Sequence, residues 1–208
     1  MLVIAIAKGR FLGPSLNLLA HAGVKFEEDL STSRRLIFDS CDSRYRAILV
    51  KPVDTPTYVE YGAADVGIAG GDVLLESGAD LLQPLDLNFG HCRIAVAAPE
   101  GTKTITGISQ PTVRVATKYP RITLDFFNAR SIPVEIISLS GSIELAPLVT
   151  LADRIVDLVE TGQTLRENGL EIIEVIAESS AQLIINRTSY QTKREEVSAL
   201  VQALETMV

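Results

Sequence analysis

The sequence predicts an α/β fold built on mainly parallel sheets. Short, continuous apolar runs recur along the chain, as is typical of strands that are covered on both faces. Segments with helical spacing separate these runs, and such an alternation favours parallel pairing. Glycine, threonine or charged residues directly follow several of the runs. In open α/β sheets ligands bind outside the carboxyl ends of strands, so these positions are the first candidates for a site.

The first part of the chain shows clear start and stop signals. Thr55 is a good N-cap, Pro56 suits the first turn of a helix, and Gly62 ends that helix. Two glycines and Asp72 open the next one. In chain order we expect a strand at 2–7, a helix at 15–22, a strand at 46–50, a helix at 55–61, a strand at 65–69 and a helix at 72–76.

The second part repeats this alternation. Ser142 is a plausible cap for one helix, and Gly169 ends another. The stretch at 99–111 is expected to be a loop. We expect strands at 93–98, 113–116, 134–138, 154–159, 172–177 and 181–185, and helices at 121–129, from 142 onward and at 164–168.

The last segment, at about 190–207, has one apolar and one charged face. Val197, Leu200, Val201 and Leu204 recur at helical spacing. This pattern predicts a helix that packs on its own domain, and a partner-binding helix is the alternative.

The composition excludes several classes of protein. Of 208 residues, 47% are hydrophobic and 22% are charged, as in ordinary globular domains. The net charge of −7 argues against nonspecific nucleic-acid binding. Two cysteines and two histidines show no metal-ligand spacing, as expected for reduced thiols in a cytosolic protein. The apolar run at 2–7 is too short for a signal peptide, and no run is long enough to span a membrane.

The strongest candidate site follows the strand at 154–159. The turn Thr161-Gly162-Gln163-Thr164 leads into a helix, so backbone N–H groups and two hydroxyls point toward one place. Gly162 lets an anion approach the backbone closely. Asp153 and Asp157 would repel a phosphate, so they would accept hydrogen bonds from ribose hydroxyls or help to hold Mg²⁺. A capped helix beside two strand-end aspartates is the alternative.

Two weaker candidates follow other strands. Lys8-Gly9-Arg10 ends the first strand and Lys51 ends the second, which suits a phosphate or carboxylate ligand. Asp72 stands at a helix start, where it is as well explained as an N-cap. Neither a Ser-His-Asp nor a Cys-His arrangement can be built, so the sequence favours positioning and charge stabilisation over covalent catalysis.

Together these segments resemble the ATP phosphoribosyltransferase family along nearly the whole chain. The similarity is most specific from Gly141 to Leu165. Over the whole chain, the segments that carry the resemblance are Lys8-Gly9-Arg10, the run from Val53 to Ile68, Gly70-Gly71-Asp72-Val73-Leu74, Thr117-Lys118-Tyr119-Pro120, Gly141-Ser142-Ile143-Glu144, Leu151-Ala152-Asp153 and Asp157-Leu158 with Thr161-Gly162-Gln163-Thr164-Leu165.

The resemblance implies two α/β lobes of the type II periplasmic-binding-protein kind, with a cleft between them. Residues 1–90 and 180–208 would form the first lobe. Residues 91–179 would form the second and carry the phosphoribosyl-binding loop.

The resemblance also implies an activity. The chain would transfer phosphoribosyl from phosphoribosyl pyrophosphate to N1 of ATP and release pyrophosphate, with Mg²⁺ carried by the substrate phosphates and no metal ligand assigned to the protein. This is the first step of histidine biosynthesis. The donor side would comprise Asp153, Asp157, Thr161, Gly162, Gln163 and Thr164. The pyrophosphate and ATP side would comprise Lys8, Gly9, Arg10, Lys51, Asp72, Arg93, Tyr119 and Glu144.

The chain resembles the short form of the family, which lacks a C-terminal regulatory domain. This implies a cytoplasmic hetero-octamer with a regulatory subunit similar to histidyl-tRNA synthetase, without nucleic-acid or membrane partners. Three residues depart from the family pattern: Thr150 replaces a usual glycine, Lys51 a usual arginine and Gly71 a common lysine. The alternatives are a non-catalytic small-anion or solute-binding protein of the same fold and a catalytically inactive structural subunit.

Overall fold

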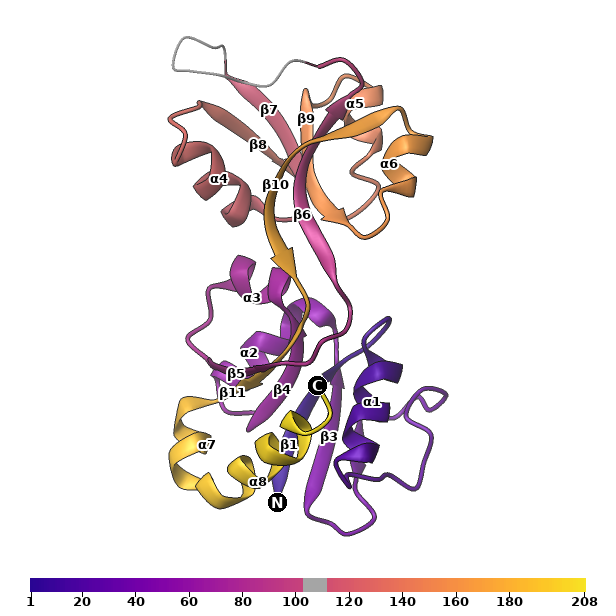
Figure 1. Cartoon of the computed structure of the whole chain (residues 1–208), viewed down its shortest axis with the longest axis vertical. Helices are drawn as coiled ribbons and strands as arrows, with labels where there is room; N and C mark the ends of the chain where they lie inside the picture. The colour runs from indigo at the N-terminus through magenta and orange to yellow at the C-terminus, as the bar shows by residue number, and fades with distance from the viewer. Residues whose placement is uncertain (103–111) are drawn as a thin grey trace. The chain divides into compact units, whose positions relative to one another are not determined.

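The computed structural model describes residues 1–102 and 112–208, so most of the loop expected at 99–111 lies outside the described residues. The described chain divides into two units. Unit 1 comprises Met1–His91 and Ser180–Val208, and unit 2 comprises Cys92–Ser179. Each unit has its own sheet flanked by helices (Figure 1), which confirms the α/β class.

Unit 1 is built on six strands: β1 (Leu2–Ala7), β2 (Ile37–Asp39), β3 (Tyr45–Val50), β4 (Val66–Gly70), β5 (Leu82–Asp86) and β11 (Ala181–Ile185). Their order in the sheet is β2-β3-β1-β4-β11-β5. β1 pairs in parallel with β3 and with β4. The carboxyl ends of these three strands therefore meet at one edge of the sheet.

Helices cover both faces of this sheet: α1 (Leu12–His21), the 3₁₀ turn η1 (Pro52–Asp54), α2 (Thr55–Glu60), α3 (Gly71–Ser77), α7 (Arg187–Thr192) and α8 (Arg194–Glu205). On one face, Leu19 of α1 and Leu200 of α8 belong to the same core as Ile4 of β1. On the other face, Val59 of α2 and Leu74 of α3 pack with residues of β1 and β11.

The C-terminal segment forms two helices where the sequence predicted one. Lys193 separates them with a non-helical backbone. Val197, Leu200 and Leu204 are buried in the core of unit 1, so the apolar face of α8 packs on its own domain, as expected.

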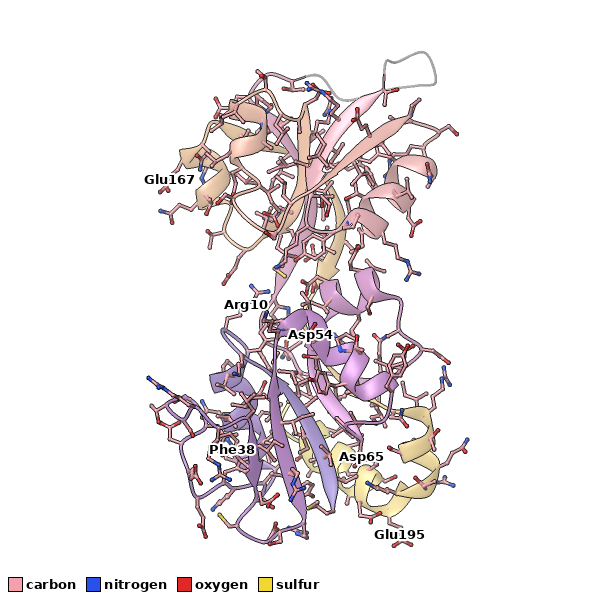
Figure 2. All side chains as sticks on the ribbon, turned by 180° about the vertical axis from the view of Figure 1, so that it is seen from behind. Arg10, Phe38, Asp54, Asp65, Glu167 and Glu195 are labelled. Carbon is pink, nitrogen blue, oxygen red and sulfur yellow. The ribbon has the colours of Figure 1, made fainter. Side chains whose placement is uncertain are left out.

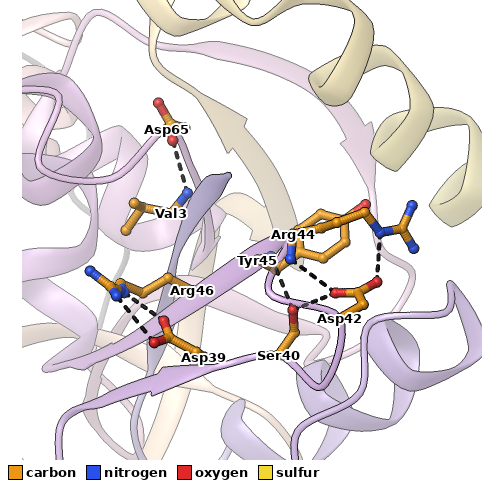
Figure 3. Close-up of polar contacts among 8 residues, drawn as sticks. All are labelled: Val3, Asp39, Ser40, Asp42, Arg44, Tyr45, Arg46 and Asp65. Atoms are coloured by element: carbon orange, nitrogen blue, oxygen red, sulfur yellow. Dashed lines mark hydrogen bonds and ion pairs between the residues drawn. The ribbon is translucent and has the colours of Figure 1, made fainter.

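A buried carboxylate ties these C-terminal helices to the sheet. Asp65 accepts hydrogen bonds from the Val3 N–H (2.8 Å), the Ser189 hydroxyl (2.7 Å) and the Lys193 ammonium (2.7 Å). Figure 3 shows the bond to Val3 next to the polar contacts of the β2–β3 hairpin, where Asp39 pairs with Arg46. Burial by itself raises the pKa of Asp65, but the bonds from Lys193, Ser189 and Val3 outweigh it and the pKa lies below its ordinary value.

Unit 2 is built on five strands: β6 (Cys92–Pro99), β7 (Val113–Thr117), β8 (Val134–Ser138), β9 (Arg154–Val159) and β10 (Leu170–Ser179). Their order is β10-β6-β9-β7-β8. β7 pairs in parallel with β8 and β9, whereas β6 is antiparallel to β9 and β10. The helix α4 (Pro120–Asn128) covers one face, and α5 (Leu145–Leu148) and α6 (Gln163–Glu167) cover the other.

The sheets are mixed, which refines the expectation of mainly parallel pairing. β2 and β3 are joined by a short turn and pair antiparallel, because a parallel return needs a longer crossover connection. β11 is antiparallel to its neighbours β4 and β5, and β10 is antiparallel to β6 in the other sheet. Among the described residues, no helix is both long enough and apolar enough to cross a membrane.

Candidate functional site

In unit 2 the residues that follow three parallel strands meet at one edge of the sheet. Thr117 of β7 lies level with Ser138 of β8 and with Val156 of β9. Lys118 therefore emerges next to Asp157, and Glu144 lies on the segment that follows β8. Because β6 is antiparallel, its first residues also lie at this edge, with Arg93 opposite Val159.

The turn after β9 leads into α6 through a left-handed glycine. Gly162 adopts a left-handed conformation (φ +73°), which favours glycine, and α6 begins directly after it. The Thr161 hydroxyl accepts a bond from the Gln163 N–H (3.3 Å). Buried Leu165 fixes the short helix to the core, while Thr161, Gln163 and Thr164 are exposed. The turn thus holds two exposed hydroxyls on an anchored backbone.

Asp157 is the unusual carboxyl group of this edge. It is half-buried and accepts a bond from the Leu158 N–H (2.8 Å). Burial raises the pKa of Asp157 from 3.8 to about 6, with a further increase from the charge of Glu144 and a decrease from the Leu158 bond and the charge of Lys118. Because burial disfavours the ionised form of Asp157, a ligand that brings hydroxyl donors or positive charge to this carboxylate stabilises its ionised form.

Arg93 and Glu144 lie near Asp157, whereas Tyr119 does not join them. Arg93 is half-buried and lies on the same face of the sheet as Asp157, because successive residues of a strand alternate between faces and Ala95 pairs with Asp157. Tyr119 is only 4% exposed and packs in the core under α4. Its side chain is therefore a core group rather than an exposed ligand contact.

The structure also separates Asp153 from the turn. Asp153 precedes β9 and binds Arg114 at the start of β7, with Nη2 to Oδ1 at 2.8 Å. Strands rise about 3.3 Å per residue, so the length of β9 places Asp153 roughly 20 Å from Thr161. The hydrogen bond from Arg114 lowers the pKa of Asp153. Asp153 is therefore an ion-pair partner at the opposite edge, and we remove it from the donor site.

Unit 1 has a comparable edge at the carboxyl ends of β1, β3 and β4. Lys8, Arg10 and Lys51 are exposed there, and the Arg10 guanidinium lies 5.0 Å from the centre of the Phe11 ring. Gly9 is left-handed (φ +85°). In Figure 2, Arg10 lies at this end of unit 1 and Asp65 at the other.

Asp72 belongs to the same edge but is buried. It is 4% exposed in the first turn of α3. A side chain at Gly70 would overlap the Asp72 carboxylate, so the glycine before α3 makes room for it. Asp72 is thus enclosed at this corner, whereas the three cations and the nearby Asp54 are exposed.

Sequence reasoning missed one residue, Lys118, which is the cation that acts on Asp157. The signal was present in Thr117-Lys118-Tyr119-Pro120, from which only Tyr119 was selected as a site residue. Among the residues that the structure describes, no three His, Cys, Asp or Glu side chains are placed to hold a metal ion.

Comparisons with known proteins show the family to which the chain belongs. The family model described as ATP phosphoribosyltransferase matches residues 51–206. A protein of Geobacter sulfurreducens named ATP phosphoribosyltransferase 2 is 50% identical over 205 residues, covering 98% of this chain and 97% of the relative. An ATP phosphoribosyltransferase of Acidithiobacillus ferrooxidans is 49% identical over 209 residues, covering 100% and 97%.

Solved structures give the same result. The ATP phosphoribosyl transferase (HisG:HisZ) complex from Thermotoga maritima matches with a TM-score of 0.87 and 38% identity, covering 99% of this chain and 98% of the other. The periplasmic aliphatic sulphonate binding protein of Escherichia coli matches with a TM-score of 0.57 and 13% identity, covering 98% and 68%. At that identity the likeness concerns the fold alone, so it does not support the solute-binding alternative.

Proposed function

This chain belongs to the ATP phosphoribosyltransferase family, matches its short form and catalyses the first step of histidine biosynthesis, and from that premise we propose which of its residues bind each group. The reaction moves phosphoribosyl from phosphoribosyl pyrophosphate to N1 of ATP. The bond between the ribose C1 and N1 forms, the bond from C1 to pyrophosphate breaks, and pyrophosphate leaves.

We propose that the turn at 161–164 holds the 5-phosphate of the donor. The observation that carries this assignment is the left-handed Gly162 between two exposed threonine hydroxyls. Backbone N–H groups at such a turn, together with hydroxyl donors, are well suited to a phosphate. The Gln163 side-chain amide donates to Glu167 (2.7 Å), and the Gln163 N–H would exchange its long bond to the Thr161 hydroxyl (3.3 Å) for one to the phosphate.

Asp157 is proposed to accept hydrogen bonds from the ribose hydroxyls. Asp157 lies four residues before Thr161, so the ribose of a donor whose 5-phosphate binds the turn would lie within reach of its carboxylate. The ribose carbon becomes cation-like as pyrophosphate leaves, so a nearby ionised carboxylate also stabilises the transition state. Arg93 and Glu144 are proposed as further contacts at the same edge.

Lys8, Gly9, Arg10 and Lys51 are proposed to bind polyphosphate. Three exposed cations and a left-handed glycine suit the phosphates of ATP or the pyrophosphate group. Mg²⁺, carried by these phosphates, would neutralise the negative charge that develops on the leaving group. Because adenine N1 is a weak neutral nucleophile, alignment of the two substrates would supply much of the acceleration.

A regulatory partner is proposed as well, on the basis of the Thermotoga maritima complex. We infer a subunit similar to histidyl-tRNA synthetase in a hetero-octamer, and a cytoplasmic location that agrees with two cysteines, Cys41 and Cys92, that do not form a disulfide. Co-expression with such a subunit followed by native mass spectrometry tests this proposal, and a chain that stays without its partner contradicts it.

The donor assignment is tested by replacing Thr161 and Thr164 together with valine. Loss of two charge-assisted bonds should weaken binding of phosphoribosyl pyrophosphate with Mg²⁺ by about 1–3 kcal/mol, measured by calorimetry. The matched control replaces Thr188 and Thr192, two exposed threonines of α7 in unit 1. Unchanged donor affinity in the Thr161 and Thr164 variant would refute the assignment.

A further inference from the structure

The turn that carries Lys118 is held by a hydroxyl group in the interior of unit 2. Thr117 is fully buried at the end of β7. Its hydroxyl donates to the carbonyl oxygen of Val156 (2.7 Å) and accepts from the Tyr119 N–H (2.8 Å). One hydroxyl group therefore joins the turn after β7 to the neighbouring strand β9.

The other end of this connection is next to Asp157. Val156 directly precedes Asp157, and Lys118 lies between Thr117 and Tyr119, whose N–H the Thr117 hydroxyl binds. The Lys118 ammonium is exposed and acts electrostatically on Asp157. A lysine side chain is long and flexible, so the place of its charge depends on where its backbone is held.

We propose that Thr117 is a positioning residue for the phosphoribosyl site: its hydroxyl fixes the Lys118 turn to β9, so that the Lys118 charge stays beside Asp157. The proposal deepens the proposed function, because it rests on Asp157 and Lys118 facing the bound donor. Ionised Asp157 and Lys118 together offer an acceptor for ribose hydroxyls and a cation for donor oxygens. Neither Thr117 nor its hydroxyl touches the donor.

Thr123 provides a matched control in the same cluster. Its hydroxyl is also buried, lies 3.3 Å from the Thr117 hydroxyl and donates to the Tyr119 carbonyl (2.7 Å). That carbonyl also accepts the Thr123 N–H (3.0 Å). Thr123→Val therefore removes a buried hydroxyl but leaves the turn fixed to β9.

The test measures the affinity for phosphoribosyl pyrophosphate with Mg²⁺ by calorimetry and the melting temperature, on the full chain. Thr117→Val has the shape of threonine without the hydroxyl and should weaken donor binding about fivefold to thirtyfold. Thr117→Ser keeps the hydroxyl and should restore affinity to within about twofold. Thr123→Val should lower the melting temperature without changing donor affinity. Equal donor affinity in Thr117→Val and the wild type overturns the proposal.

Lys118→Met completes a double-mutant cycle and separates this proposal from the proposed function. If Thr117 acts through Lys118, adding Thr117→Val to Lys118→Met should weaken donor binding no further. Additive effects of the two changes overturn the proposal, even when the Thr161 and Thr164 variant confirms the donor loop. Should Thr117→Val fail to fold, Thr117→Cys fits the same space with only a weak acceptor and takes its place in the cycle.

Discussion

Replacement of Asp157 by asparagine should stabilise the ligand-free chain near neutral pH while it weakens donor binding. Burial raises the pKa of Asp157 from 3.8 to about 6. Each pKa unit corresponds to about 1.4 kcal/mol, so keeping this carboxylate ionised costs the folded state up to about 3 kcal/mol. The folded state binds the proton more tightly than the unfolded state, so this contribution becomes unfavourable as the pH rises from about 4 to about 6 and stays so above it.

Asparagine is neutral, has nearly the same shape and can still accept the bond from the Leu158 N–H. We therefore expect Asp157→Asn to raise the free energy of unfolding by about 1–3 kcal/mol at pH 7 and to leave it nearly unchanged at pH 4. Urea unfolding at both pH values measures this difference. Calorimetry with phosphoribosyl pyrophosphate and Mg²⁺ should show donor affinity at least about tenfold weaker, because the ribose loses a charged acceptor.

Asp153→Asn, at the residue before the same strand, is the matched control and should act in the opposite direction. The Arg114 bond lowers the pKa of Asp153, so its charge favours folding at pH 7. The pair is largely exposed, so its loss should cost less than about 1 kcal/mol. An Asp157→Asn chain that is less stable than the wild type at pH 7, or equally stabilised at pH 4 and pH 7, would refute the reasoning about burial.

Three further predictions concern stability. Thr150 has φ +58°, a conformation that disfavours a β-branched residue, so Thr150→Gly should raise the free energy of unfolding by about 1 kcal/mol in urea titrations, and a decrease would contradict this. Asp65→Asn should lower the free energy of unfolding by about 2–4 kcal/mol at pH 7 and should make stability fall less steeply in acid, whereas an unchanged acid profile would contradict this prediction. The reason is that the hydrogen bonds to Asp65 lower its pKa by more than burial raises it, so its stabilising contribution disappears as the pH falls. Gly90→Ala should lower the melting temperature more than Gly101→Ala, since both have positive φ but only the former places a methyl group into the Phe11 ring; equal shifts would contradict the steric reasoning.

Part of the site followed from local sequence. The turn at 161–164 needs a glycine with positive φ between two hydroxyls, and Gly162 has that conformation. Thr150 is a second local feature: it has φ +58°, a conformation that favours glycine, and it occupies the position where the family usually has glycine. Such features depend on a few adjacent residues, so their pattern is visible in the printed chain.

Other site residues could be placed only by long-range pairing. Asp153 directly precedes β9 and Asp157 lies within it, and the register against β7 places Asp153 beside Arg114 and Asp157 beside Lys118. Tyr119 looked like an exposed ligand contact, but its place under α4 buries its ring. The structure alone shows which face and which edge each side chain reaches.

The sequence by itself determined every strand except β2 and β5, together with the α/β class and the family of this protein, because apolar periodicity and motif spacing are properties of neighbouring residues. It also determined the turn on which the proposed donor site depends. Only the tertiary structure decided the direction of β11 and β10, the ion pair that removes Asp153 from the site, and the hydroxyl bridge from Thr117 to β9. These depend on hydrogen bonds between segments that are distant in the chain, whose partners no local pattern specifies.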